Sequence, residues 1–165
     1  MYIHTYPDKI LKTKCEPITV INGDVQTLIE TMIEIMYKNN GIGLAAPQVG
    51  IPSQIIIFDT NKNGLTVVIN PSITLNKEEF FSLESCLSIP GFEGKVKRKQ
   101  VVYLEGTDRY EKPINIEATD LLAACIQHEV EHLQGILLLD RVIRSKKEAY
   151  LKKLKKYRKA NNNKL

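Results

Sequence analysis

The sequence has only three cysteines in 165 residues, a number that is both small and odd. It argues against a framework of disulfide bonds and indicates a reducing compartment, where thiols stay free. No apolar run approaches the roughly 20 residues that cross a membrane, and the opening residues 1–7 do not have the pattern of a signal peptide. We therefore expect a cytoplasmic protein with no membrane partner.

Internal repeats and low-complexity segments are also absent. The chain is 43% hydrophobic and 25% charged, which is typical of an ordinary soluble globular protein. At this length a single core is the simplest arrangement. The sequence thus predicts one domain.

Acidic residues are scarce at the C-terminal end. Residues 144–165 hold ten Lys or Arg against one acidic residue, Glu148, so the rest of the chain, with a total net charge of +4, is net negative. The segment has the pattern of an amphipathic helix followed by a frayed end at residues 161–163, and four of its side chains could contact the body or a partner: Ala149, Leu151, Leu154 and Tyr157. A solvated helix and a helix that docks on RNA both fit this pattern.

Histidine is scarce too, with three in the chain, yet two of them stand in His128-Glu129-Val130-Glu131-His132. The surrounding segment predicts a buried helix that Thr119 caps and Gly135 ends. Four residues make slightly more than one turn, so His128 and His132 share a face and can bind one cation. Glu129 lies beside that cation, where a carboxylate can act on a water without ligating the metal. His4 is interpreted as an ordinary surface or strand residue.

Two histidines do not complete a catalytic centre, which usually has three protein ligands and a water. A metzincin protease would have a third histidine six residues after the second, but that position is Leu138. A thermolysin-like protease would use a later glutamate, and the first one available is Glu148. An intracellular metallopeptidase therefore stays open as an alternative, while other third ligands must come from upstream.

The remaining pattern predicts a helix from about residue 24 to residue 38 after a turn at residues 22–24. β-Branched and alternating runs predict strands at residues 54–59, 66–70, 71–75, 80–83, 95–105, 112–117 and 137–139, with hairpin turns at residues 61–64 and 108–111. Strands cluster between helices and do not alternate with them. The fold class is therefore α+β: a central HExxH metal-binding helix packed among largely antiparallel β-strands, with an N-terminal and a C-terminal helix.

Three segments of the chain, in this order and spacing, resemble the signature motifs of the bacterial-type peptide deformylases: Gly41–Gly50, Glu84–Ser88 and Gln127–His132. The opening, with Pro7-Asp8 and Cys15-Glu16-Pro17-Ile18, is similar as well. The resemblance implies a catalytic domain over residues 1–145, with residues 146–165 as a Lys-rich helix and frayed tail of the same domain. One departure is Ser85, where the family usually has glycine; serine costs little unless the position needs a positive φ angle.

The resemblance implies that Cys86, His128 and His132 bind one divalent metal ion, with a water in the fourth position. It favours iron(II) in the cell, and zinc, nickel or cobalt can substitute, since each suits a Cys-His-His ligand set. Glu129 would be the general base. The donors to the developing oxyanion would be the side-chain amide of Gln48 and the backbone N–H of Leu87.

The implied substrate is the N-formylmethionyl end of a nascent peptide, which is hydrolysed to formate and a free amine. The implied substrate-binding residues are Ile42, Gly43, Leu44, Glu84, Leu121, Ala124 and Cys125, with the peptide extended beside the Gly43-Leu44 backbone. Glu84 and Arg98 can form a charged pair that braces the cysteine loop, and an exposed position for both residues fits the sequence equally well. The implied setting is the ribosome, which the basic tail could contact, and specific DNA binding is not expected.

A third interpretation is a ribosome-associated module without enzymatic activity, in which the metal is structural and the basic tail carries the function. Structural zinc sites are closed by four protein ligands, and the sequence offers no evident fourth one. Replacing Glu129 by Gln distinguishes this alternative from an enzyme, and replacing Cys86 by Ala distinguishes a metallopeptidase that uses Glu148.

Overall fold

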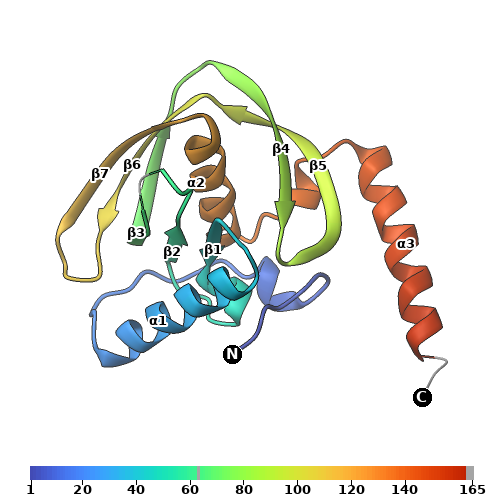
Figure 1. Cartoon of the computed structure of the whole chain (residues 1–165), viewed down its shortest axis with the longest axis horizontal. Helices are drawn as coiled ribbons and strands as arrows, with labels where there is room; N and C mark the ends of the chain where they lie inside the picture. The colour runs from blue at the N-terminus through green and yellow to red at the C-terminus, as the bar shows by residue number, and fades with distance from the viewer. Residues whose placement is uncertain (63, 163–165) are drawn as a thin grey trace.

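Two sheets flank the buried helix α2 (Asp120–Leu133) in the computed structural model, which describes residues 1–62 and 64–162 (Figure 1). The larger sheet is antiparallel with strand order β1-β2-β3-β6-β7, and the smaller is the β4–β5 hairpin. The strands are β1 (Gly43–Ala45), β2 (Ile55–Phe58), β3 (Thr66–Leu75), β4 (Glu79–Cys86), β5 (Ile89–Lys99), β6 (Val101–Thr107) and β7 (Pro113–Thr119). The other helices are α1 (Gly23–Lys38), α3 (Arg144–Asn162) and the 3-10 helices η1 (Lys9–Lys12), η2 (Ala46–Val49) and η3 (Leu138–Asp140). The predicted α+β class is confirmed.

Helix α2 ends as its sequence predicts. Gly135 has φ +72°, its N–H donates to the His132 carbonyl, and the Ile136 N–H donates to the Glu131 carbonyl. This is the paired hydrogen bonding of a Schellman motif, which satisfies the last carbonyls of the helix. Thr119 stands at the N-cap position, but its hydroxyl donates to the Asp120 carboxylate and not to the helix backbone. Thr119 therefore occupies the N-cap position without making a capping hydrogen bond to the helix.

The sheet has apolar side chains on both faces. One face of β2 packs with α2 through Ile56 and Phe58, and the other packs with α1 through Ile55 and Ile57. This double burial explains why β2 is a continuous apolar run instead of an alternating one. The predicted helix at residues 24–38 is confirmed as α1, and its buried residues are Leu28, Ile29, Met32 and Met36.

Two strand predictions are wrong. Residues 95–105 were expected to form one strand, but the chain breaks at Gln100, so that β5 pairs with β4 while β6 joins the larger sheet. Both strands bury alternate residues, so the period of two continues across the break. Residues 137–139 were expected to form a strand, but they form part of η3 and its N-cap. The prediction failed because three successive buried leucines do not distinguish a strand from a helical turn. The predicted turn at residues 61–64 does join antiparallel β2 and β3, although Asn63 lies outside the described residues.

Helix α3 is amphipathic, but its buried side differs from the predicted one. Tyr150, Leu151 and Leu154 pack against the β4–β5 hairpin and η3, whereas Ala149 and Tyr157 are exposed. Asn161 and Asn162 belong to the helix, and the last residue of the expected frayed segment, 163, lies outside the described range. None of the helices in the described part of the chain combines the length and apolar character needed to cross a membrane.

Candidate functional site

The structure brings three candidate ligands together from two elements. Cys86 is the last residue of β4, and His128 and His132 project from one face of α2. Cys86 Sγ lies 3.3 Å from His132 Nε2, which lies 3.2 Å from His128 Nε2. The donor atoms of all three residues lie within 4.8 Å of one another, and the residues are buried or half-buried.

These separations fit a single bound cation. Metal bonds of about 2.0–2.1 Å to nitrogen and about 2.3 Å to sulfur, arranged tetrahedrally, place two nitrogens about 3.3 Å apart and a nitrogen and a sulfur about 3.6 Å apart. The orientation of His128 fits as well, since its Nδ1 lies 3.1 Å from Glu84 Oε2 and its Nε2 faces the other donors. Burial lowers the pKa of His132 well below its ordinary value, which favours the neutral imidazole that ligates metals.

A buried charged network contacts His128 at Nδ1, the ring nitrogen that faces away from the other two candidate ligands. Arg98 donates to both carboxylate oxygens of Glu84, at 2.7 and 2.8 Å, and pairs with Glu131 at 2.8 Å. Burial raises the pKa of Glu84, but the hydrogen bonds from Arg98 and His128 lower it to about 2. Glu84 therefore stays a carboxylate that can accept from His128 Nδ1 and hold its ring in place. The predicted Glu84–Arg98 pair is present.

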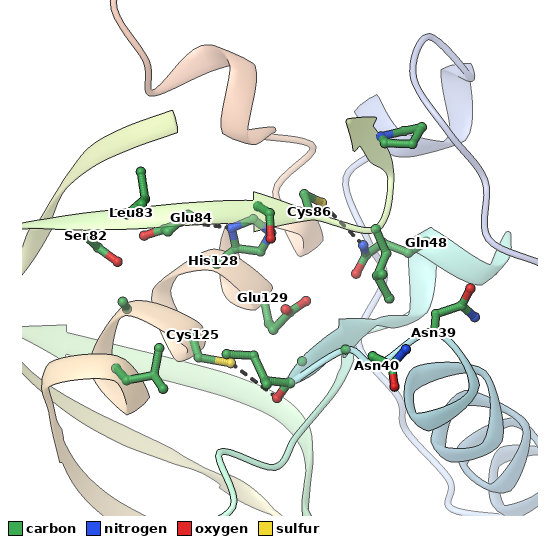
Figure 2. Close-up of a pocket in the computed structure, with 18 of the residues that line it drawn as sticks. Asn39, Asn40, Gln48, Ser82, Leu83, Glu84, Cys86, Cys125, His128 and Glu129 are labelled. Atoms are coloured by element: carbon green, nitrogen blue, oxygen red, sulfur yellow. Dashed lines mark hydrogen bonds and ion pairs between the residues drawn. The ribbon is translucent and has the colours of Figure 1, made fainter. Parts of the chain in front are cut away.

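Glu129 is a buried carboxylate on α2, near His128 and Cys86 (Figure 2). The residue is 4% exposed, and its Oε2 has no hydrogen-bond partner among the residues that the structure describes. Burial raises the pKa of Glu129 to about 7, and Glu84 raises it too, against opposing effects of His128 and Arg98. A carboxyl group with a pKa near neutrality can both take up and release a proton at the site.

Gln48 lies in η2 with its amide held in a defined orientation. The Ala45 N–H donates to Gln48 Oε1 at 2.9 Å, so the amide nitrogen must be the atom that faces Ser88 Oγ, at 3.1 Å, and Cys86 Sγ, at 3.6 Å. Leu87 belongs to the two-residue turn between β4 and β5. Gln48 and Leu87 both line the cavity beside the three ligands.

The cavity in front of these groups has a volume of about 530 Å³ and lies between β1, β4 and α2 (Figure 2). Six predicted substrate-binding residues line it: Ile42, Gly43, Glu84, Leu121, Ala124 and Cys125. Leu44 does not. Its side chain is fully buried on the opposite face of the sheet, against α1, because successive strand residues point to opposite faces. Ser85 also lines the cavity and lies in extended strand β4 opposite Glu93, a conformation open to serine.

Several lining residues were missed by the sequence analysis: Asn39, Asn40, Gly41, Ser82, Leu83, Pro90 and Gly91. Ser82 and Leu83 could have been found because they precede Cys86 along the same strand. Pro90 and Gly91 could not, because they reach the cavity through an irregularity where Ser85 pairs with Glu93 but Cys86 pairs with Ile89. Ser88 was also given no role, and it is fully buried beneath Gln48.

The structure excludes Glu148 as a ligand. It is on α3, 59% exposed, and paired with Arg144 at 2.6 Å. The group of candidate ligands found among residues 1–62 and 64–162 contains three side chains, which is the number of an open catalytic site and not of a closed structural one. Both alternative interpretations lose their structural basis.

The chain matches the family model described as polypeptide deformylase over residues 1–148. It is 52% identical over 157 residues to a peptide deformylase of Thermodesulfovibrio yellowstonii, covering 93% of this chain and 95% of the relative. Among solved structures, the peptide deformylase of Legionella pneumophila is similar with a TM-score of 0.90 and 34% identity, covering 97% of this chain and 96% of that one. The peptide deformylase of Synechococcus elongatus in complex with actinonin has a TM-score of 0.87 and 38% identity, with 92% and 84% covered.

Proposed function

The chain belongs to the polypeptide deformylase family, and from this premise we propose which of its residues carry out the removal of the N-formyl group. The enzyme is a metal-dependent hydrolase that acts on the N-terminal formylmethionine of nascent peptides and releases formate. The roles of individual residues follow from the contacts described above. The buried, unpaired carboxylate oxygen of Glu129 beside three convergent donors carries the proposal.

Cys86, His128 and His132 hold one divalent ion, and their mutual distances support this assignment. Such an ion, when bound, activates a water and polarises the formyl carbonyl. Iron(II) is the metal we propose in the cell, with zinc, nickel or cobalt as substitutes, because a thiolate with two imidazoles suits all four. The metal content of protein purified without oxygen tests this choice.

Glu129 moves the proton. Its carboxylate accepts a proton from the attacking water as the oxygen of that water bonds to the formyl carbon, and the protonated carboxyl then donates to the amide nitrogen as the C–N bond breaks. The products are formate and the free amine. The buried position of Glu129 beside the three ligands supports this role, because burial raises the pKa of a carboxyl group and makes its protonated form more accessible.

Gln48 and Leu87 stabilise the negative charge that develops on the formyl oxygen. The Gln48 amide nitrogen lies beside Cys86 Sγ, and the Leu87 backbone follows Cys86 directly. Preorganised donors of this kind are strong in a buried site because they need no rearrangement during the reaction. Removing one of them typically raises the barrier by about 3 kcal/mol.

The peptide lies extended along the edge strand β1, beside Gly43, with its methionine side chain in the cavity. Leu121, Ala124 and Cys125 form the apolar wall on α2, and Ile42 and Glu84 lie across from it. An edge strand offers unpaired backbone groups to such a ligand. Leu44 contributes to binding through its backbone only, since its side chain is buried elsewhere.

We further propose that residues 1–145 form the catalytic domain and that residues 146–165 are a tail of the same domain. Tyr150 supports this arrangement because it packs on Phe92 and its hydroxyl donates to the Pro90 carbonyl at 3.2 Å. The exposed lysines of α3 suit electrostatic docking on ribosomal RNA. A cytoplasmic location follows from the nascent peptides on which the enzyme acts.

The test is formate release from a formyl-Met-Ala-Ser peptide by protein purified without oxygen, compared with the Glu129→Gln variant. Metal content is measured in both. We expect the variant to keep its metal and to lose at least about a hundredfold in kcat, since the amide cannot carry the proton. Glu148→Gln is the matched control, because it makes the same change on an exposed side chain of α3 and should leave turnover intact.

Cys86→Ala completes the experiment. It should empty the site if Cys86 is a ligand, and it would leave the metal in place if the ion were held by other residues. A metal-loaded Glu129→Gln variant with full activity would overturn the role of Glu129. A wild-type protein that holds metal but releases no formate would overturn all the assigned roles together and draw attention to Ser85.

A further inference from the structure

We infer that Ser88 is a positioning residue that orients the side-chain amide of Gln48 for the reaction, an inference that rests on the role proposed for Gln48. Ser88 is fully buried and follows Leu87 in the turn between β4 and β5. Its Oγ accepts a hydrogen bond from Gln48 Nε2 at 3.1 Å. Forty residues separate the two side chains in sequence, so this contact exists only in the folded chain.

The Gln48 amide is held at both ends. Its oxygen accepts from the Ala45 N–H at 2.9 Å, and one of its two N–H groups is directed to Ser88 Oγ. The nitrogen also donates to Cys86 Sγ at 3.6 Å, on the side of the cavity (Figure 2). With one N–H donated to Ser88, the second is directed toward Cys86, the side on which the formyl oxygen would develop its charge.

The N-terminal segment holds the two backbones in register. The His4 N–H donates to the Gln48 carbonyl at 2.8 Å, and the Tyr6 N–H donates to the Ser88 carbonyl, also at 2.8 Å. Two alternate residues of the N-terminal segment therefore bridge η2 and the β4–β5 turn. The side chains of Ser88 and Gln48 are hydrogen-bonded to each other, and their main-chain carbonyls both accept from the N-terminal segment. These contacts limit the motion of the Gln48 amide relative to Cys86.

Replacing Ser88 by Ala removes the acceptor and leaves a buried N–H without a partner. The amide then lacks the contact that directs its second N–H. Complete loss of an oxyanion donor costs about a hundredfold to a thousandfold in kcat, so misdirection of an intact donor should cost less, about tenfold. KM should change less than about twofold, because Ser88 does not line the cavity that binds the peptide.

The decisive test is a double-mutant cycle of Ser88→Ala and Gln48→Ala, with kcat, KM and metal content measured on zinc-loaded protein. If Ser88 acts through Gln48, its replacement should lower kcat about tenfold in the wild-type background and less than about twofold in the Gln48→Ala background. Ser53→Ala, at a half-buried serine away from the cavity, is the matched control and should leave kcat unchanged. An equal loss in both backgrounds, or no loss in the first, would overturn the inference.

A measurement on the unaltered protein covers the case in which Ser88→Ala fails to fold or to hold metal. The Gln48 side-chain amide is assigned in the NMR spectrum of the zinc-loaded protein by its absence from the Gln48→Ala variant. One of its two protons should exchange with solvent at least about tenfold more slowly than the other, because a hydrogen-bonded proton is protected. Equal exchange of both would overturn the inference, whether or not the roles assigned under the proposed function hold.

Discussion

The backbone of β1 comes close to a carboxylate in the candidate site. Gly43 of β1 lies directly against Glu129, so that a Cβ at this position would lie well inside van der Waals contact with Glu129 Oε1 and only 2.8 Å from Cys125 Sγ. Both of those side chains project from α2, which packs on β1. Glycine at 43 thus sets how near β1 can come to Glu129, the general base that we propose.

Gly43→Ala should therefore lower kcat/KM for formyl-Met peptides by about a hundredfold, since a displacement of about 1 Å at a reacting group can cost that much. The added methyl must push Glu129 or Cys125 aside. Gly23→Ala is the control, because a Cβ at the start of α1 meets nothing within 4 Å, and it should leave activity unchanged. Wild-type kcat in a folded, metal-loaded Gly43→Ala protein would contradict the argument.

Site residues that are close together in the sequence could be predicted better than residues that meet only in the fold. His128, Glu129 and His132 could be placed correctly because the helical period alone determines which of them share a face. Cys86 came from a motif and not from spacing, since 46 residues separate it from His132. Ser88 meets Gln48 through a contact across 40 residues that no local pattern encodes, and the side chain of Leu44 faces away from the cavity because adjacent strand residues point to opposite faces.

At the scale of elements, Asp140 joins three parts of the chain. Its carboxylate in η3 accepts from Lys12 at the end of η1 and from Lys147 of α3 at 3.0 Å, and it also accepts from the Leu137 N–H at 3.0 Å. Burial raises the pKa of Asp140, but these three donors lower it to about 2. Because the folded pKa lies below the ordinary value of 3.8, Asp140 stabilises the fold above pH 4, and this stabilisation disappears as the pH falls toward 2.

Asp140→Asn should lower the free energy of unfolding by about 1 kcal/mol at pH 6, the upper end for ion pairs that water partly screens. The difference between variant and wild type should be constant from pH 5 to 7, shrink below about pH 4 and vanish near pH 2. Urea unfolding at a series of pH values measures it. Glu34→Gln, on the exposed face of α1, is the control, and a difference for Asp140→Asn that grew on acidification would refute the linkage.

Element boundaries were less predictable than element types. The break at Gln100 leaves no mark on the alternating pattern, because β5 and β6 both present one face to a core. β5 and β6 are separate strands because they pair with different neighbours: β5 pairs with β4, and β6 pairs with β3 and β7. Pairing across sheets depends on contacts distant in sequence. By contrast, α1 could be predicted closely because the Asn22 side chain accepts from the Val25 N–H, a local cap.

Charge is separated across the whole molecule. The C-terminal residues 144–165 carry ten basic residues and one acidic one, while the rest of the chain is net negative. One side of α3 contacts the body through Tyr150, Leu151 and Leu154, and also through Lys147 to Asp140 and Arg158 to the Tyr6 carbonyl. The other side presents lysines to solvent. The cavity lies between β1, β4 and α2, whereas α3 lies beyond β5, on the side away from α2 (Figure 1). A polyanion could therefore bind α3 without obstructing the peptide site.

Replacing Lys152, Lys153, Lys155 and Lys156 by Gln should weaken co-sedimentation with ribosomes while formate release from a short peptide stays unchanged. Each phosphate contact contributes roughly 0.7–0.9 to the slope of log K against log salt concentration, so the variant should also lose up to about three units of that slope. The matched control replaces four exposed lysines of the body, Lys9, Lys14, Lys77 and Lys112. If both sets of replacements weakened ribosome binding equally, the attraction would come from overall charge. If the replacements in α3 did not weaken ribosome binding, docking through this helix would be refuted.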